Sequence, residues 1–181
     1  KKHDFIYIAV GAEKARKLNI PGEDLPGLPD PLKFLSDYRR GKPLKPGKTI
    51  LVIGGGNTAM DAARTARRLA GPDGHVVLVY RRTRREMPAH QEEIDACLAD
   101  GVELMELTAP ISIASHPSGG LEMKCIRMKM GEADESGRAR PVPLTGSEFS
   151  LRADSIIPAV GQEVNLPFFG EEPLKLTGKD F

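Results

Sequence analysis

An apolar, strand-forming run breaks into three glycines near residue 54 and continues directly as a helix-forming segment. Residues 51–60 read LVIGGGNTAM and contain the pattern Gly-x-Gly-x-x-Ala. In this pattern Gly54 permits a tight turn, Gly56 lets a pyrophosphate approach the backbone, and Ala59 allows close packing of helix on strand. Next to Gly55 and Gly56, the first turn of the helix has unpaired amides and the positive end of the helix dipole. Both favour the binding of an anion. The junction predicts a dinucleotide site.

Three segments around the glycines complete a strand–helix–strand unit. Residues 49–53 and 75–80 have the composition of buried strands, and residues 57–69 carry an alanine-rich face at helical spacing. A glycine cluster also makes ordinary tight turns, which is the alternative interpretation. The strand on each side of the helix favours the dinucleotide site. We expect Arg64, Arg67 and Arg68 on the solvated side of this helix.

The second strand ends in arginines where many dinucleotide sites carry a carboxylate. An Asp or Glu about 20 residues beyond the fingerprint usually binds the ribose hydroxyls of NAD or FAD. This chain instead has Tyr80, Arg81 and Arg82, followed by Arg84 and Arg85. A guanidinium can donate two hydrogen bonds to one phosphate, so we expect NADP(H), with Arg81 and Arg82 at its 2′-phosphate and Arg85 a weaker candidate. A solvated basic loop is the alternative.

Length and charge narrow the class of protein. The chain has 181 residues, 40% hydrophobic content and a net charge of +1, which fits either one globular domain with its own core or a domain with trailing pieces. Such a balance gives no general attraction to polyanions. A nucleic-acid surface on residues 80–85 is a competing interpretation, disfavoured because the patch is short and holds one tyrosine. No apolar run approaches the roughly 18 residues of a membrane span, and we expect a cytoplasmic protein.

Cysteines and histidines give no sign of a metal centre or a redox pair. Cys97 and Cys125 lack the Cys-x-x-Cys spacing. We expect both to be buried small hydrophobes. The four histidines are scattered along the chain, so no metal site is predicted.

One phrase occurs near both ends of the chain. Residues 4–11 and 154–161 share the pattern Asp-x-Ile-x-x-Ala-Val-Gly, which predicts two strands that end in the same small-residue turn. Such a turn can lie close to a ligand or another backbone; a chance match is the alternative. The Pro- and Gly-rich residues 20–47 resemble a linker, interrupted by a short amphipathic helix over residues 31–39.

The pattern of elements predicts an α/β protein with a Rossmann-like parallel sheet flanked by helices and an antiparallel β-meander. A second helix is expected over residues 89–99 and a charged loop over residues 131–140. The remaining strands are expected at residues 102–107, 111–114, 121–130 and 148–151, with 154–160 closing the sheet.

Three motifs are specific to one family. Residues 53–61 read IGGGNTAMD, residues 79–82 read VYRR and residues 86–89 read EMPA. The chain resembles the NADPH-binding domain of the glutamate synthase small (beta) subunit and related FAD-dependent pyridine nucleotide-disulphide oxidoreductases, including the pyridine-nucleotide half of dihydropyrimidine dehydrogenase. The resemblance spans essentially the whole chain, including residues 20–23 and both Ala-Val-Gly turns.

The resemblance implies a division of the chain. Residues 1–45 would be a stub of an FAD domain with a linker, residues 46–158 the NADPH-binding domain, and residues 159–181 the return toward the FAD domain. No FAD fingerprint or four-cysteine iron–sulfur set occurs in the sequence. We therefore expect an excised domain that binds NADPH without turning over alone.

The resemblance also implies the chemistry of the parent enzyme. Hydride would pass from NADPH to FAD, and electrons onward through iron–sulfur clusters, with the FAD domain of the same chain and an iron–sulfur or large catalytic subunit as partners. Asn57 and Thr58 would cap the helix or touch phosphate, and Ala159 and Gly161 would let the nicotinamide end pass. No acid–base residue is nominated. A non-catalytic module that senses NADP(H) or docks a partner is the alternative.

Overall fold

The computed structural model describes residue 7, residue 9, residues 11–133 and residues 139–164. Three α-helices lie in this part of the chain: α1 (Pro31–Arg39), α2 (Asn57–Ala70) and α3 (Gln91–Ala99). A 3-10 turn, η1, spans Arg84–Glu86. The strands are β1 (Lys14–Ala15), β2 (Thr49–Ile53), β3 (His75–Val79), β4 (Glu103–Met105), β5 (Thr108–Ser115), β6 (Leu121–Ala133), β7 (Ala139–Pro143), β8 (Phe149–Ala153), β9 (Ser155–Pro158) and β10 (Gln162–Glu163).

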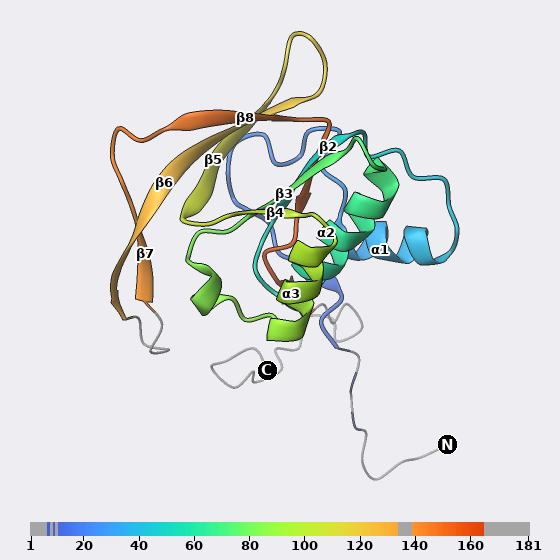
Figure 1. Ribbon diagram of the computed structural model, residues 1–181, viewed down its shortest axis with the longest axis horizontal. Coiled ribbons are helices and arrows are strands. Elements are labelled where there is room, and N and C mark those ends of the chain that lie inside the picture. Colours follow the sequence, from blue (N-terminus) through green and yellow to red (C-terminus); the bar gives the residue numbers. More distant parts are fainter. Residues whose placement is uncertain (1–6, 8, 10, 134–138, 165–181) are drawn as a thin grey trace, which may run out of the picture.

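A parallel sheet forms the middle of three layers. Its strand order is β4-β3-β2-β9, and the expected closing strand thus pairs with β2 at one edge. Figure 1 shows the helices on one side of this sheet and strands β5–β8 on the other. Ile50 and Val52 pack with the helices, whereas Leu51 and Ile53 pack with the antiparallel strands, because successive side chains of a strand point to opposite faces.

The helical layer lies close to the sheet because α2 presents small residues to it. Ala59, Ala62, Ala63 and Ala66 are fully buried. Phe34 of α1 joins the same core. Helix α1 begins where the sequence predicted, since the side chain of its N-cap residue Asp30 accepts a 2.8 Å hydrogen bond from the Lys33 amide and Pro31 occupies the first turn.

The antiparallel layer is built around the long strand β6. Its first half pairs with β5 and β8, and its second half pairs with β7. The expected meander is therefore present, but the loop expected over residues 131–140 was wrong at both ends, because β6 continues to Ala133 and β7 begins at Ala139. Strand β7 contains Pro141 and Pro143, which predict against a strand but are tolerated at a sheet edge.

The segment that precedes α1 is packed against both sheets. Leu18, Ile20 and Leu28 contact the core between the sheets. The carbonyl of Pro21 accepts a 2.8 Å hydrogen bond from the Ile113 amide, and the carbonyl of Gly27 accepts one of 3.0 Å from Ile156. Residues resembling a linker thus fill part of the molecule, whereas the domain boundaries inferred from the resemblance stay predictions.

Other differences from the sequence analysis are local. Helix α3 begins at Gln91 instead of residue 89, because the Ala89 amide donates to the carbonyl of Gly55. Strand β4 is shortened by Leu107, whose φ is +49°. The first copy of the repeated phrase, residues 4–11, lies mostly outside the described residues. Strands β1 and β10, which the sequence did not predict, pair antiparallel.

The two cysteines are buried, as expected. Burial raises the pKa of the Cys97 thiol to about 11 and that of Cys125 to about 12. Among the described residues, no helix is long and apolar enough to cross a membrane. No group of three or more His, Cys, Asp or Glu side chains there could hold a metal ion.

The contact of residue 22 with β5 can be tested by a pair of glycine substitutions. Both Gly22 and Gly41 have positive φ, but a Cβ at Gly22 would lie 1.8 Å from the Ile113 carbonyl oxygen, whereas none of the described atoms approaches a Cβ at Gly41 within 4 Å. We expect Gly41→Ala to lower the free energy of unfolding by about 1–2 kcal/mol through backbone strain alone, and Gly22→Ala by about 2–5 kcal/mol. Urea unfolding measures the free energy of unfolding of both variants. Equal losses in the two would contradict the close contact of Gly22 with Ile113.

A second prediction concerns acid stability. The carboxylate of Asp37, nearly buried in α1, accepts hydrogen bonds from Lys33 and from Lys42 at 2.6 Å, and these hold the pKa of Asp37 at about 2, below its ordinary value of 3.8. A carboxylate whose pKa is lowered by folding stabilises the folded state at pH values above its ordinary pKa. This stabilisation is lost as the pH falls toward the lowered pKa of about 2. We expect the difference in melting temperature between wild type and Asp37→Asn to be constant above about pH 5 and to shrink below about pH 4. A difference in melting temperature that does not change with pH would contradict this role of Asp37.

Candidate functional site

Each glycine after β2 has a different surrounding. Gly54 has a φ of +146°, and a Cβ there would lie 2.2 Å from the Ala159 carbonyl oxygen. A Cβ at Gly55 would lie 2.5 Å from the ring of Tyr80. No described atom comes within 4 Å of a Cβ built at Gly56. The first two glycines are therefore required by packing, and the third leaves space beside its backbone.

The first turn of α2 has no side-chain cap. Gly56 is the N-cap residue and no side chain caps the helix, so capping, one of the two alternatives given for Asn57 and Thr58, is absent. The Asn57 Oδ1 atom instead accepts a 3.0 Å hydrogen bond from the His90 amide, and Thr58 Oγ1 accepts one of 3.2 Å from Gln162 Nε2. An uncapped helix start next to a glycine with open space is suited to an anion.

A cleft of about 550 Å³ opens at the carboxyl ends of the strands. Most of the candidate residues line it, namely Gly54, Gly55, Gly56, Thr58, Arg81, Arg82, Ala159 and Gly161. Asn57 and Arg85 do not line it, and Ala59 is buried beneath Gly54. The sequence analysis missed Arg16 and Lys17, which enter the cleft wall because the amide of Arg16 donates a 3.0 Å hydrogen bond to the Gly161 carbonyl.

The arginines after β3 differ in what surrounds them. Arg81 is exposed, lines the cleft, and makes no hydrogen bond or ion pair with any described residue. The side chain of Arg82 is buried, and its Nε donates a 3.0 Å hydrogen bond to the carbonyl of Ala139 in β7. Arg85 is exposed and lines a separate hollow beside Thr83. Arg81 is thus the guanidinium of this loop that is available inside the cleft.

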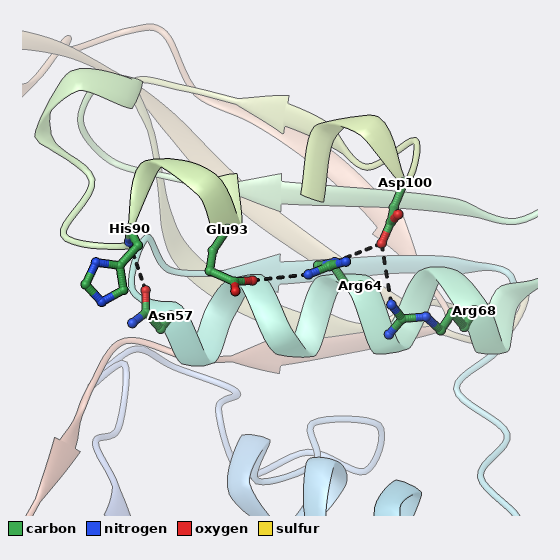
Figure 2. Close-up of polar contacts among 6 residues, drawn as sticks. All are labelled: Asn57, Arg64, Arg68, His90, Glu93 and Asp100. Atoms are coloured by element: carbon green, nitrogen blue, oxygen red, sulfur yellow. Dashed lines mark hydrogen bonds and ion pairs between the residues drawn. The ribbon is translucent and has the colours of Figure 1, made fainter. Parts of the chain in front are cut away.

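Ion pairs hold α3 beside α2 (Figure 2). Arg64 donates to Asp100 Oδ2 at 2.8 Å and to Glu93 Oε2 at 3.1 Å, and Arg68 lies 3.7 Å from the same Asp100 oxygen. The hydrogen bond from Arg64 lowers the pKa of Asp100. The expectation of a solvated Arg64 was wrong, because α3 packs next to α2 and brings two carboxylates to the half-buried guanidinium. Arg67 is also half-buried, and its guanidinium donates a hydrogen bond to the Gly71 carbonyl at the end of α2.

The chain matches the pyridine nucleotide-disulphide oxidoreductase family over residues 2–180. The chain belongs to this family. The structure of FprA from Mycobacterium tuberculosis in complex with NADPH is similar, with a TM-score of 0.68 and 25% identity over 88% of this chain and 50% of that one. The predicted fold class, an FAD/NAD(P)-binding type, is confirmed.

Two curated relatives agree with the resemblance to glutamate synthase. The beta subunit of an NADP(+)-dependent formate dehydrogenase from Moorella thermoacetica is 41% identical over 93% of this chain and 24% of its own length. The small chain of an NADPH glutamate synthase from Azospirillum brasilense is 35% identical over 98% of this chain and 39% of its own length. The chain therefore spans less than half of either relative.

The unequal roles of the glycines predict unequal effects on stability. We expect Gly54→Ala to lower the free energy of unfolding by about 2–4 kcal/mol, because the new methyl group meets the Ala159 backbone at a strained φ. Gly56→Ala should cost about 1 kcal/mol or less, since the site is open and the change affects an N-cap position only. Urea unfolding of both variants checks this, and a comparable loss in Gly56→Ala would contradict the assignment.

Proposed function

We propose that this chain is the NADP(H)-binding domain of a flavin-dependent oxidoreductase that resembles the glutamate synthase beta subunit and delivers hydride from NADPH to FAD. The observation that carries the proposal is one cleft with an uncapped helix start at one point and, at another, Arg81, which has no partner among the described residues. The NADPH complex of FprA and the NADPH- or NADP-dependent relatives support it.

The residues of the cleft fit a dinucleotide. Its volume of about 550 Å³ falls within the range of small-molecule sites. The pyrophosphate would lie on Gly54, Gly55 and Gly56, because the open side of Gly56 lets it approach the amides at the start of α2. The buried alanines beneath this turn keep the helix terminus close to the sheet.

The 2′-phosphate would be recognised at the end of β3. Arg81 would donate its planar pair of hydrogen bonds to the phosphate. Arg82 would lie beside it, with its own Nε holding β7. Arg85, which lies outside the cleft, would contribute less. No carboxylate stands at positions 80–82 to favour NAD(H).

Ala159 and Gly161 line the cleft after β9, which lies across β2 from β3, and the nicotinamide would lie there. When bound, the nicotinamide supplies the hydride. The contribution of this chain is to orient it, and no acid–base side chain is assigned. FAD would be held by the FAD domain of the parent chain, with iron–sulfur clusters or a large catalytic subunit as onward partners. These partners and the cytoplasmic location stay predictions.

Calorimetric titration of the chain with NADPH, NADH and FAD tests the proposal. We expect NADPH to bind more tightly than NADH and FAD not to bind. Arg81→Ala should lower the NADPH/NADH affinity ratio about 10- to 100-fold, which is the loss of one charge-assisted contact.

Arg39→Ala is the charge-matched control, because Arg39 is exposed on α1 and outside the cleft. It should leave the ratio unchanged. A ratio that Arg81→Ala does not alter would refute the 2′-phosphate assignment, and FAD binding in place of NADPH would refute the proposed function.

A further inference from the structure

The loop that carries the arginines is attached to the glycine turn, residues 54–56, and to the start of α2 by hydrogen bonds that involve no arginine. Residues 81–90 are here named the arginine loop. The amide of Ala89 donates to the carbonyl of Gly55 at 3.1 Å, and the amide of His90 donates to Asn57 Oδ1 at 3.0 Å. Figure 2 shows this second bond between the start of α2 and the start of α3. The last two residues of the loop are therefore tied to the turn and helix start at the cleft.

The loop is also held along its length. The hydroxyl of Tyr80 donates to the Glu86 carbonyl at 2.9 Å, and the Glu86 carboxylate accepts from the Thr83 amide at 3.0 Å. The carbonyl of Arg82 accepts a 3.1 Å hydrogen bond from Leu107. The conformation between Arg81 and His90 thus depends on backbone and carboxylate contacts and does not require the Arg81 guanidinium.

Asn57 lies at the helix start without lining the cleft. Its side chain is exposed, and its carbonyl oxygen faces the His90 amide. The ion pairs of Arg64 with Glu93 and Asp100 hold α3 beside α2 further along. The Asn57 bond sits at the other end of this helix pair, where the arginine loop enters α3.

We propose that Asn57 is a positioning residue for nucleotide selectivity: by holding the His90 amide, it fixes the arginine loop relative to the start of α2 without touching the nucleotide. The inference rests on the proposed function. A pyrophosphate at the helix start and a 2′-phosphate at Arg81 belong to one ligand, so both contacts form together only when the loop is held in place. A loop ordered before binding loses less entropy on binding.

The consequence is confined to one of the two nucleotides. NADPH uses both phosphate positions, whereas NADH has no 2′-phosphate. A less ordered arginine loop therefore weakens the binding of NADPH and leaves the binding of NADH nearly unchanged. A direct contact of Asn57 with the pyrophosphate would behave differently, because its removal would weaken both nucleotides equally.

The test is a titration of the 181-residue chain with NADPH and NADH for wild type, Asn57→Ala and Asn57→Asp. Asn57→Ala should lower the NADPH/NADH affinity ratio about three- to tenfold, the effect of one net hydrogen bond. Asn57→Asp should keep the ratio near the wild-type value, since a carboxylate accepts the same bond, while its negative charge weakens both nucleotides. Asp61→Asn, on the exposed face of α2 and without a described partner, is the control and should not change the ratio.

Hydrogen exchange of the His90 amide gives a readout that does not depend on nucleotide. Exchange should be faster in Asn57→Ala than in wild type or Asn57→Asp. Equal weakening of both nucleotides by Asn57→Ala, or the same loss of ratio in Asn57→Asp, would overturn the inference while leaving the proposed function intact. A wild-type chain with no preference for NADPH would overturn both.

Discussion

The close approach of two turns at the carboxyl ends of β2 and β9 determines the rest of the site. The turn after β2 passes so near the turn after β9 that Gly54 has no room for a side chain beside the Ala159 carbonyl. Strand β2 lies between β3, which follows it in the chain through α2, and β9, which comes much later in the chain, so the strand order changes direction at β2. In open α/β sheets ligands bind outside the carboxyl ends of the strands at such a point. The contact of Gly54 with Ala159 thus places the start of α2 at the mouth of the cleft.

A second constraint sets where the arginine loop can lie. The ring of Tyr80 occupies the space that a side chain at Gly55 would fill, and its hydroxyl holds the Glu86 carbonyl. The turn after β2 therefore makes two different contacts. Gly55 packs against Tyr80 at the end of β3, and Gly56 leaves the start of α2 open. One short segment in this way relates the two positions at which the proposed dinucleotide would carry phosphate.

The sequence was sufficient for features that depend on neighbouring residues. The strand–glycine–helix junction, helix α1 and the buried strands follow from local composition. It was insufficient where partners are distant in the chain. Asn57 meets His90 only because α3 begins beside α2, and the burial of Arg82 depends on a hairpin whose second strand contains two prolines. Neither contact has a local signal, since both arise from the packing of separate elements.

The motif at residues 86–89 acquires a physical meaning from these contacts. Glu86 closes the short turn η1, the side chain of Met87 is buried in the helical core, and the Ala89 amide holds the Gly55 carbonyl. Three of the four residues thus determine the shape of the loop. A sequence resemblance at this motif therefore indicates a shared loop conformation.

The number of arginines in the loop is by itself a poor guide to phosphate recognition. Arg81 and Arg82 are adjacent in sequence, yet one guanidinium is available in the cleft and the other is buried against β7. Under the proposed function, selectivity for the 2′-phosphate would depend on Arg81, which has no partner among the residues that the structure describes.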